Sequence, residues 1–252
     1  YKIINSGYIT NISLENILNN LETEILSLTK TTESQNLLST TELLSNLILE
    51  LKQKSFEPSL PGLASGFFDL DSITQGFQKS DLIIIAGRPS MGKTAFCLKI
   101  AINIIKNYQL PVLFFSLEMS KEQLIYRLLA SETKINSLRL KSGSLYKYDW
   151  AVLNETIQVF SGLPFFIDDT PHLTIQDIRI KIKNLMFEQT KIGIIIIDYL
   201  QLMQNSKIEQ ENRVQELSLI TRSLKTIARE FNVPIITLSQ LSRNVETRLN
   251  KR

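Results

Sequence analysis

The stretch Gly87-Arg88-Pro89-Ser90-Met91-Gly92-Lys93-Thr94 matches the pattern G-x4-G-K-[ST], which is typical of loops that bind the phosphates of a nucleotide. At average residue frequencies this pattern arises by chance in about one chain in a hundred of this length. Here it follows an apolar run, Leu82–Ala86, and opens a helical pattern, Thr94–Asn107, as the mechanism requires. Loop amides and a helix N-terminus supply hydrogen-bond donors and a positive dipole for phosphate oxygens. We therefore predict a nucleotide phosphate site in which Lys93 reaches the β- and γ-phosphates and the Thr94 hydroxyl binds Mg²⁺.

Apolar runs alternate with helical patterns along the rest of the chain. The run Ile194-Ile195-Ile196-Ile197 holds no polar residue, which indicates a strand buried on both faces, as in a parallel sheet with helices on either side. The predicted fold class is therefore α/β, with a mostly parallel sheet flanked by helices. The predicted strands are Leu82–Ala86, Val112–Ser116, Phe165–Asp168, Gly193–Asp198 and Pro234–Ser239, and the helices between them include Thr94–Asn107, Lys121–Ala130, Thr174–Thr190 and Asn212–Phe231.

Asp198 stands at the carboxyl end of the isoleucine-rich strand. In open α/β sheets this end of the strands carries the ligand crevice. A carboxylate there can hold Mg²⁺, through water, beside Thr94. A strand-end Asp can also be purely structural, but the phosphate loop favours the magnesium role.

Two further polar residues follow predicted strands. Glu118 lies two residues after Val112–Ser116, where it could act as the base or orient the water that attacks the γ-phosphate. The alternative is that Glu118 only caps the helix that begins at Lys121. Gln240 directly follows Pro234–Ser239, where an uncharged amide could sense the γ-phosphate, and the alternative is that this amide bonds only backbone groups.

Other polar or reactive residues are better explained without a functional role. His172 lies in a turn, has no partner ligands, and is predicted to be a surface residue. Asp168 and Asp169 end a strand and fit a solvated strand end or a helix cap. Cys97 has apolar neighbours on the phosphate-loop helix and is predicted to lie in the core. Trp150, near the expected start of a helix, is predicted to be a packing residue.

Composition excludes several classes of protein. The chain has 252 residues, of which 43% are hydrophobic and 21% charged, so neither a disordered tail nor a collagen-like fibre fits. A single cysteine excludes a disulfide-stapled scaffold, and there is no Cys/His cluster for structural zinc. No apolar run approaches the roughly 18 residues of a transmembrane helix, so we expect no membrane partner. The net charge of +3 is too small by itself to indicate nucleic-acid binding.

Residues with A/T-rich codons are abundant, with 33 Ile and 17 Asn against 7 Ala. This composition indicates an A/T-rich genome such as that of an organelle or a symbiont. We therefore expect a plastid stroma or a bacterial cytoplasm as the location. The chain begins with Tyr1 rather than Met and shows no targeting segment, so we expect a fragment or a processed piece of a longer protein.

The first sixty residues differ from the rest. Ser13 can cap a helix in which Leu14, Ile17, Leu18, Leu21, Ile25 and Leu28 recur at helical spacing. A second helix can begin at Thr40 or Thr41, and Pro58 and Pro61-Gly62 mark a boundary near residue 60. Neither helix has a core of its own, so each must pack on the following domain or dock on a neighbouring subunit. We divide the chain into a helical linker or subunit-docking segment, 1–60, and a nucleotide-binding domain, 61–252.

From residue 62 onward the chain resembles the ATPase domain of replicative DNA helicases of the DnaB family. The resemblance rests on the phosphate loop, with its Arg-Pro-Ser-Met insert, and on four further strings. The strings are Gly66-Phe67-Phe68-Asp69-Leu70-Asp71, Phe115-Ser116-Leu117-Glu118-Met119, Ile197-Asp198-Tyr199-Leu200-Gln201-Leu202-Met203 and Leu238-Ser239-Gln240-Leu241-Ser242-Arg243. The Arg-Pro-Ser-Met insert and the Asp-Tyr-Leu-Gln-Leu-Met string argue against the rival interpretation, another RecA-like ring ATPase.

The resemblance implies a RecA-like fold, a hexameric ring, and translocation on single-stranded DNA driven by ATP hydrolysis. It assigns the attacking water to Glu118, Mg²⁺ to Thr94 and Asp198, and γ-phosphate sensing to Gln240. It also implies that primase and a loader are partners of the full-length protein. The family pattern would continue beyond Arg252 with a DNA-binding loop and basic residues that act in a neighbour's site. A ring component without turnover of its own is therefore the alternative for this chain.

Two polar segments follow the strands that end near the predicted site and are candidates for DNA contact. They are Gln204–Arg213 and Gln240–Arg252, with Lys207, Arg213, Arg243 and Arg248 as the basic residues. A ring helicase should grip the DNA backbone through charge and amide donors, with little reading of bases. Neither segment holds an aromatic residue for base stacking, and the alternative is that these are ordinary solvated charges.

Overall fold

The computed structural model describes residues 40–56, 60–171, 173–189, 191–202 and 213–241. The chain divides into two compact units, with the division between Ser59 and Leu60. In the described ranges no helix is long and apolar enough to cross a membrane.

Helix α3 (Thr40–Phe56) is the described element of the first unit. It begins at Thr40, as the sequence predicts, and carries Glu42 in its first turn, where a negative charge stabilises a helix N-terminus. The helix predicted around residues 14–28 lies outside the described residues. Several apolar side chains of α3 are more than half exposed, in agreement with a helix that has no core of its own: Leu44, Leu47, Ile48, Leu49 and Leu51.

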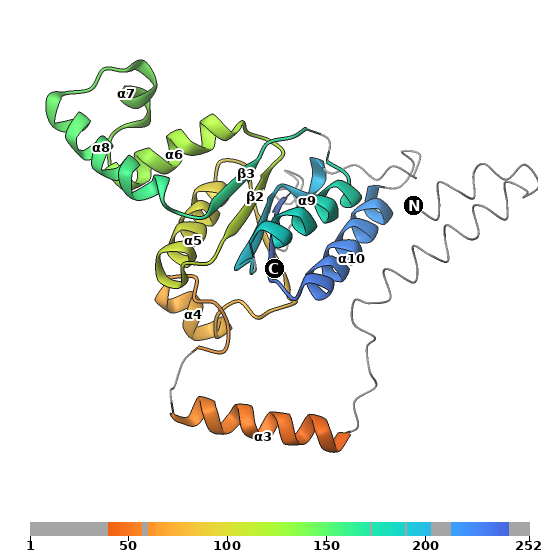
Figure 1. Cartoon of the computed structure of the whole chain (residues 1–252). Coiled ribbons are helices and arrows are strands. Elements are labelled where there is room, and N and C mark those ends of the chain that lie inside the picture. The colour runs from red at the N-terminus through yellow and green to blue at the C-terminus, as the bar shows by residue number, and fades with distance from the viewer. Residues whose placement is uncertain (1–39, 57–59, 172, 190, 203–212, 242–252) are drawn as a thin grey trace, which may run out of the picture. The chain divides into compact units, whose positions relative to one another are not determined.

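Five parallel strands form one sheet in the second unit (Figure 1). They are β1 (Leu82–Gly87), β2 (Val112–Ser116), β3 (Phe165–Asp168), β4 (Ile194–Asp198) and β5 (Ile235–Gln240), in the spatial order β1-β5-β4-β2-β3. The predicted parallel sheet is confirmed, and no predicted strand end is off by more than one residue.

The isoleucine run explains why β4 lies inside the sheet. All five residues of β4 are buried, with Ile194 and Ile196 in one hydrophobic cluster and Ile195 and Ile197 in the other. Burial of one such side chain contributes about 1.5–3 kcal/mol of transfer free energy. A strand this apolar is stable only where helices cover both faces.

Helices cover both faces of the sheet. On the face of Ile194 and Ile196 lie α5 (Lys93–Tyr108) and α6 (Lys121–Thr133), which contribute core residues such as Ile102 and Leu124. On the opposite face lie α9 (Ile175–Glu188) and α10 (Arg213–Phe231), with core residues such as Ile182 and Leu224. The predicted α/β layers are therefore confirmed.

Two helices of the second unit were not predicted, α4 (Phe68–Thr74) and α7 (Ser137–Ser142). The helix expected to start near Trp150 is α8 (Lys147–Ser161). Helix α8 buries Leu153 in a small cluster of its own with Leu140 of α7 and leaves most of its surface exposed. The predicted packing role of Trp150 is wrong, because this side chain is 50% exposed. The start of α8 depends instead on Asp149, whose carboxylate accepts the Tyr146 amide at 2.8 Å and pairs with Arg139.

The segment before β1 packs on the phosphate-loop helix. The Asp71 carboxylate accepts the amides of Ser65 and Gly66 at 2.7 and 3.1 Å, which fixes the turn that leads into α4. Next to this turn, the rings of Phe67 and Phe96 lie 4.9 Å apart, and Phe96 belongs to α5. The Gly66-Phe67-Phe68-Asp69-Leu70-Asp71 string therefore supports α5 from outside the sheet.

Candidate nucleotide-binding site

The phosphate loop lies between the end of β1 and the start of α5, as predicted. Gly92 is the N-cap of α5 and has no side chain to satisfy the free amides of the first turn, so these remain available to a ligand. Gly92 has a φ of +80°, which is a left-handed conformation that L residues with a Cβ adopt only with strain. The space around Gly92 is open, so its backbone angle is what requires glycine.

Lys93 lies over the loop that it is predicted to serve. Its Nζ donates to the carbonyls of Gly87 and Arg88, at 2.8 and 2.9 Å. Both partners are neutral carbonyls rather than carboxylates, so among the described residues Lys93 has no ion pair that a phosphate would have to displace. The ammonium group is already held at the loop where the sequence predicts phosphate binding.

Thr94 and Asp198 meet at the carboxyl edge of the sheet. The Thr94 Oγ1 donates to Asp198 Oδ2 at 2.7 Å, and Asp198 is only 2% exposed. Hydroxyl and carboxylate oxygens are hard ligands that suit Mg²⁺. In the part of the chain that is described, no three His, Cys, Asp or Glu side chains gather as a metal cluster. Mg²⁺ held here would therefore take its other ligands from water and nucleotide phosphates, as is usual for this ion.

Burial sets the electrostatics of this carboxylate. Loss of solvent raises the pKa of Asp198 above its ordinary value, and the hydrogen bond from Thr94 opposes that rise. The charge of Glu118 raises the pKa of Asp198 further, whereas the nearby cation Lys93 lowers it. A divalent cation at this position would favour the ionised carboxylate. The donor set and its charge thus fit a magnesium site.

Glu118 lies on the turn beside Asp198. Ser116 is in register with Asp198, and the Leu117 amide donates to the Asp198 carbonyl at 2.7 Å. The Ser116 hydroxyl donates to the Met119 carbonyl at 2.6 Å, so the turn that carries Glu118 is closed by its own hydrogen bond. The side chain of Glu118 is exposed, as a group that orients water must be.

The alternative role of Glu118 as a helix cap is wrong. Ser120 is the N-cap of α6, and its side chain accepts the Gln123 amide at 3.4 Å. A second contact comes from Asp169, whose carboxylate accepts the Lys121 amide at 3.0 Å. Of the two roles considered for Asp169, a solvated strand end and a helix cap, this contact favours the helix cap. Asp168, at the end of β3, is paired with Lys181.

Gln240 ends β5 next to the start of the phosphate loop. It is in register with Gly87, and the following Leu241 amide donates to the Gly87 carbonyl at 3.2 Å. The Gln240 side chain is exposed, and its carboxamide makes no hydrogen bond to another described residue. The alternative that this amide bonds only backbone groups has no support here, and the side chain is available to a ligand.

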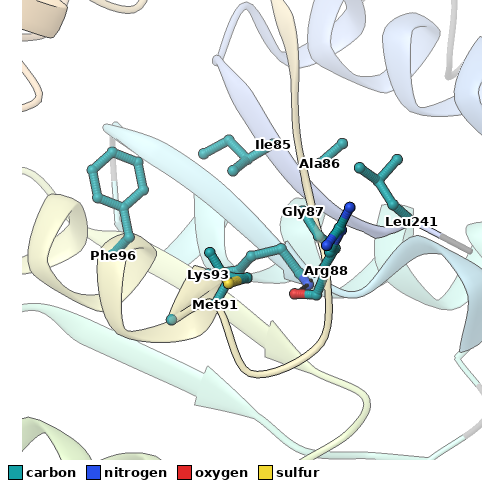
Figure 2. A pocket seen from close by; sticks show the side chains of 9 residues that line it. Ile85, Ala86, Gly87, Arg88, Met91, Lys93, Phe96 and Leu241 are labelled. Atoms are coloured by element: carbon teal, nitrogen blue, oxygen red, sulfur yellow. Dashed lines mark hydrogen bonds between the residues drawn. The ribbon is translucent and has the colours of Figure 1, made fainter. Parts of the chain in front are cut away.

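An open cavity of about 510 Å³ adjoins the loop. Figure 2 shows Phe96 from α5 on one side of this cavity and Arg88 with Leu241 on the other. The remaining lining comes from β1 and the loop: Ile85, Ala86, Gly87, Met91, Gly92 and Lys93. Apolar walls beside a phosphate loop could receive the uncharged part of a nucleotide. The sequence did not predict this lining, because it joins residues from three separate elements.

Of the remaining predicted residues, one lies in the described core, and the others lie outside the described residues or have an undescribed side chain. Cys97 is fully buried, and burial raises the pKa of its thiol to about 12, so its predicted place in the core is confirmed. Those outside the described residues are His172, Lys207, Arg243 and Arg248. Arg213 begins α10, but the position of its side chain is not described.

The sequence also missed one polar link. Gln201 stands in the Asp-Tyr-Leu-Gln-Leu-Met string, but the sequence predicts no structural or functional role for it. It lies in the short 3-10 helix η1 (Leu200–Leu202), and its amide reaches the end of β5. Nothing in the local sequence could reveal a contact across 38 and 39 positions.

A parallel sheet with a phosphate loop after β1 and a buried carboxylate at the end of β4 defines a RecA-like P-loop domain. The family is shown by the match of residues 62–252 to the DnaB-like helicase C-terminal domain. The chain belongs to this family, as its motifs predicted.

Known proteins agree with this assignment. A probable replicative DNA helicase from Trieres chinensis is 67% identical over 252 residues, which is 100% of this chain and 55% of that protein. The replicative DNA helicase DnaB of a Nostoc species is 50% identical over 252 residues, which is 100% of this chain and 28% of that protein. A solved DnaB-like replicative helicase, whose structure was described with its primase interactions, gives a TM-score of 0.75 at 33% identity, covering 100% of this chain and 58% of that one. The chain therefore spans little more than half the length of the Trieres chinensis protein.

Proposed function

We propose that the chain is the nucleotide-binding part of an ATP-dependent replicative DNA helicase. The observation that carries this proposal is the 2.7 Å contact between Thr94 and Asp198 beside the phosphate loop, in a domain of the DnaB-like helicase family. The contact joins the two oxygen ligands that a Mg²⁺–ATP complex needs from the protein.

In this proposal the residues divide the work of ATP hydrolysis. Lys93 and the loop amides bind the phosphates, while Thr94 and Asp198 hold Mg²⁺, which neutralises charge on the phosphate oxygens. Glu118 orients the attacking water and accepts its proton. Gln240 contacts the γ-phosphate. Loss of this contact on hydrolysis moves the end of β5 and, with it, the segment that follows β5.

We further propose that single-stranded DNA is the polymer on which the protein acts. The supporting observations are the family and two chain positions: η1 directly precedes residues 203–212, and β5 is followed by Leu241 and then by residues 242–252. Basic residues in and beside these segments would contact phosphates without reading bases. They are Lys207, Arg213, Arg243 and Arg248.

Assembly and partners are also proposals. A hexameric ring, with residues 1–60 as a linker or docking segment and 61–252 as the ATPase domain, fits the family and the division after Ser59. Primase and a loader are proposed partners of the full-length protein, and the similar DnaB-like helicase was described with primase. The composition supports a plastid stroma or a bacterial cytoplasm as the location.

Strand displacement on a forked DNA tests the proposal. The full-length protein with ATP and Mg²⁺ should release the labelled strand, and Lys93→Ala should not. Lys191→Ala is the matched control, because Lys191 is exposed and precedes β4, at the amino ends of the strands and not at their carboxyl ends. Release of the strand by Lys93→Ala at the wild-type rate would contradict the proposal. ATP binding without any hydrolysis by the wild-type protein would favour the alternative, a ring component without turnover.

A further inference from the structure

The end of β5 is held on one side by main-chain contacts with β1. Gln240 is in register with Gly87, and the Leu241 amide donates to the Gly87 carbonyl. The same carbonyl accepts the Nζ of Lys93 at 2.8 Å. This side of β5 is therefore tied directly to the base of the phosphate loop.

On its other side β5 loses its main-chain neighbour before it ends. The pairing between β4 and β5 stops at Ile197 and Thr237. Beyond that pair the chain of β4 turns away, and the Asp198 carbonyl accepts the Leu117 amide, next to β2. The last residues of β5, Ser239 and Gln240, thus have no β4 residue in register with them.

The side chain of Gln201 fills this gap. Its Nε2 donates to the Ser239 Oγ at 3.0 Å and to the Gln240 carbonyl at 3.2 Å. Its Oε1 accepts the Gln240 amide at 3.4 Å. A primary amide has the same kinds of donor and acceptor as a peptide group, so Gln201 binds β5 as the next residue of a neighbouring strand would.

The backbone that carries Gln201 is itself held in place by packing. Its neighbour Leu200 is 4% exposed and packs in the core cluster that contains Ile197 and Ile220. Asp198, the proposed magnesium ligand, lies only three residues before Gln201. One short path therefore runs from Asp198 through Gln201 and Gln240 to Gly87.

We propose that Gln201 is a positioning residue for Gln240. Its side-chain amide fixes the end of β5 relative to Asp198 and the phosphate loop. In that position the Gln240 side chain contacts a γ-phosphate. The proposal rests on the proposed function, in which Gln240 makes that contact. Gln201 itself does not touch the nucleotide, so its effect appears where the γ-phosphate is present and not where it is absent.

Equilibrium binding of two nucleotides tests this directly. The affinities of the chain for Mg²⁺–ATPγS and Mg²⁺–ADP are measured by titration, and their ratio reports the γ-phosphate contact. Gln201→Ala should keep the ADP affinity within about twofold, because Lys93, Thr94 and Asp198 are untouched. The ratio should fall about tenfold, the size expected for one lost hydrogen bond to a charged group.

A double-mutant cycle separates positioning from a general loss of structure. If Gln201 acts through Gln240, then Gln201→Ala should have little effect in a chain that already carries Gln240→Ala. Gln201→Glu provides a second variant of similar size, whose carboxylate can accept the Gln240 amide but cannot donate to its carbonyl. It should lower the ratio as well. Gln158→Ala, on the exposed surface of α8, is the matched control and should leave the ratio unchanged.

Three results would overturn the proposal: an unchanged ratio in both Gln201 variants, an equal loss of ADP and ATPγS affinity, or additive effects of Gln201→Ala and Gln240→Ala. If the wild-type chain binds neither nucleotide, the proposed function fails, and this proposal fails with it. If the wild-type chain binds both nucleotides but Gln240→Ala leaves the ratio unchanged, only the γ-phosphate role and the present proposal are lost.

Discussion

The hydroxyl of Thr94 donates a hydrogen bond of 2.7 Å to the carboxylate of Asp198, although 104 positions separate them in the chain. Thr94 lies in the first turn of α5 after β1, and Asp198 is the last residue of β4, with β5 between the two strands. The parallel sheet brings both to one edge because the carboxyl ends of its strands face the same way.

Asp198→Asn should stabilise the nucleotide-free chain while it weakens Mg²⁺-dependent nucleotide binding. Burial raises the pKa of Asp198, so the folded chain binds this proton more tightly than the unfolded chain does. Stability linked to this group is fully present below the ordinary carboxyl pKa and is lost as pH rises through the raised one. At neutral pH the variant avoids a buried charge, and its Tm should rise by about 2–4 °C if about 1 kcal/mol is gained.

Thermal unfolding at several pH values tests whether Asp198→Asn raises the Tm at neutral pH. The Tm difference between Asp198→Asn and wild type should grow as pH rises from acid to neutral. Asp177→Asn should not stabilise, because hydrogen bonds from Thr174 hold the pKa of Asp177 below its ordinary value. A lower Tm for Asp198→Asn at neutral pH would contradict the view that burial disfavours the charged form of Asp198.

Gly92→Ala should damage the phosphate loop through backbone strain. A Cβ at a φ of +80° costs about 1–2 kcal/mol, and relief of that strain would shift the loop amides away from the phosphates. We expect a lower Tm and at least about tenfold weaker nucleotide binding, measured by calorimetry on the same samples.

Two other glycines are matched controls for Gly92→Ala. Gly143 has a φ of +70° far along the chain from the loop, so Gly143→Ala should cost stability without affecting nucleotide binding. Gly162 has no positive φ, and a Cβ there meets open space, so Gly162→Ala should be neutral in both assays. Equal nucleotide affinity in Gly92→Ala and Gly143→Ala would show that the loop conformation does not matter for binding.

Glu118→Gln should preserve nucleotide binding and remove hydrolysis. The amide keeps the shape of the side chain but cannot accept a proton, and a general base contributes about 10²–10⁴ in rate. Single-turnover hydrolysis of labelled ATP by the full-length protein measures the loss. Glu122→Gln changes an exposed carboxylate four residues further on, in the first turn of α6, and should hydrolyse as wild type does. Normal turnover in Glu118→Gln would mean that another group orients the water.

Lys207→Ala and Arg243→Ala should each weaken binding to single-stranded DNA and flatten its salt dependence. One lost phosphate contact lowers the slope of log affinity against log salt by about 0.7 for a single strand. Fluorescence anisotropy with an oligothymidine probe at several salt concentrations gives the slopes. Unchanged slopes in both variants, equal to that of Lys191→Ala, would place DNA binding on other residues of the full-length protein.

The sequence predicts most of the fold because its strands are strongly apolar. The Ile194–Ile197 run leaves no choice but burial on both faces, and the glycines and lysine of the loop mark where β1 ends. Helix α7 and the full extent of α8 could not be predicted, because few of their residues are buried. Leu140 and Leu153 contribute to a small cluster, while Tyr148 and Trp150 are exposed and obscure the helical period.

The sequence predicts those site residues that stand at or just after the end of a strand. Glu118, Asp198 and Gln240 could be placed because parallel strands put their carboxyl ends at one edge. The role of Gln201 could not be predicted, because it depends on where the pairing of β4 with β5 stops, and that is decided by packing between distant segments. The cavity beside Phe96 and Leu241 likewise exists only once α5 and β5 are in place.

The central claim is that Gly87–Thr94 and Asp198 form a Mg²⁺–nucleotide site, and calorimetric titration with Mg²⁺–ATP tests it most directly. The wild-type chain and the control Lys191→Ala should each bind one nucleotide per chain. Lys93→Ala should lose the ammonium group that lies over the loop carbonyls, and no binding heat should be detected at the same concentrations. Binding by Lys93→Ala with the wild-type affinity and stoichiometry would contradict the account.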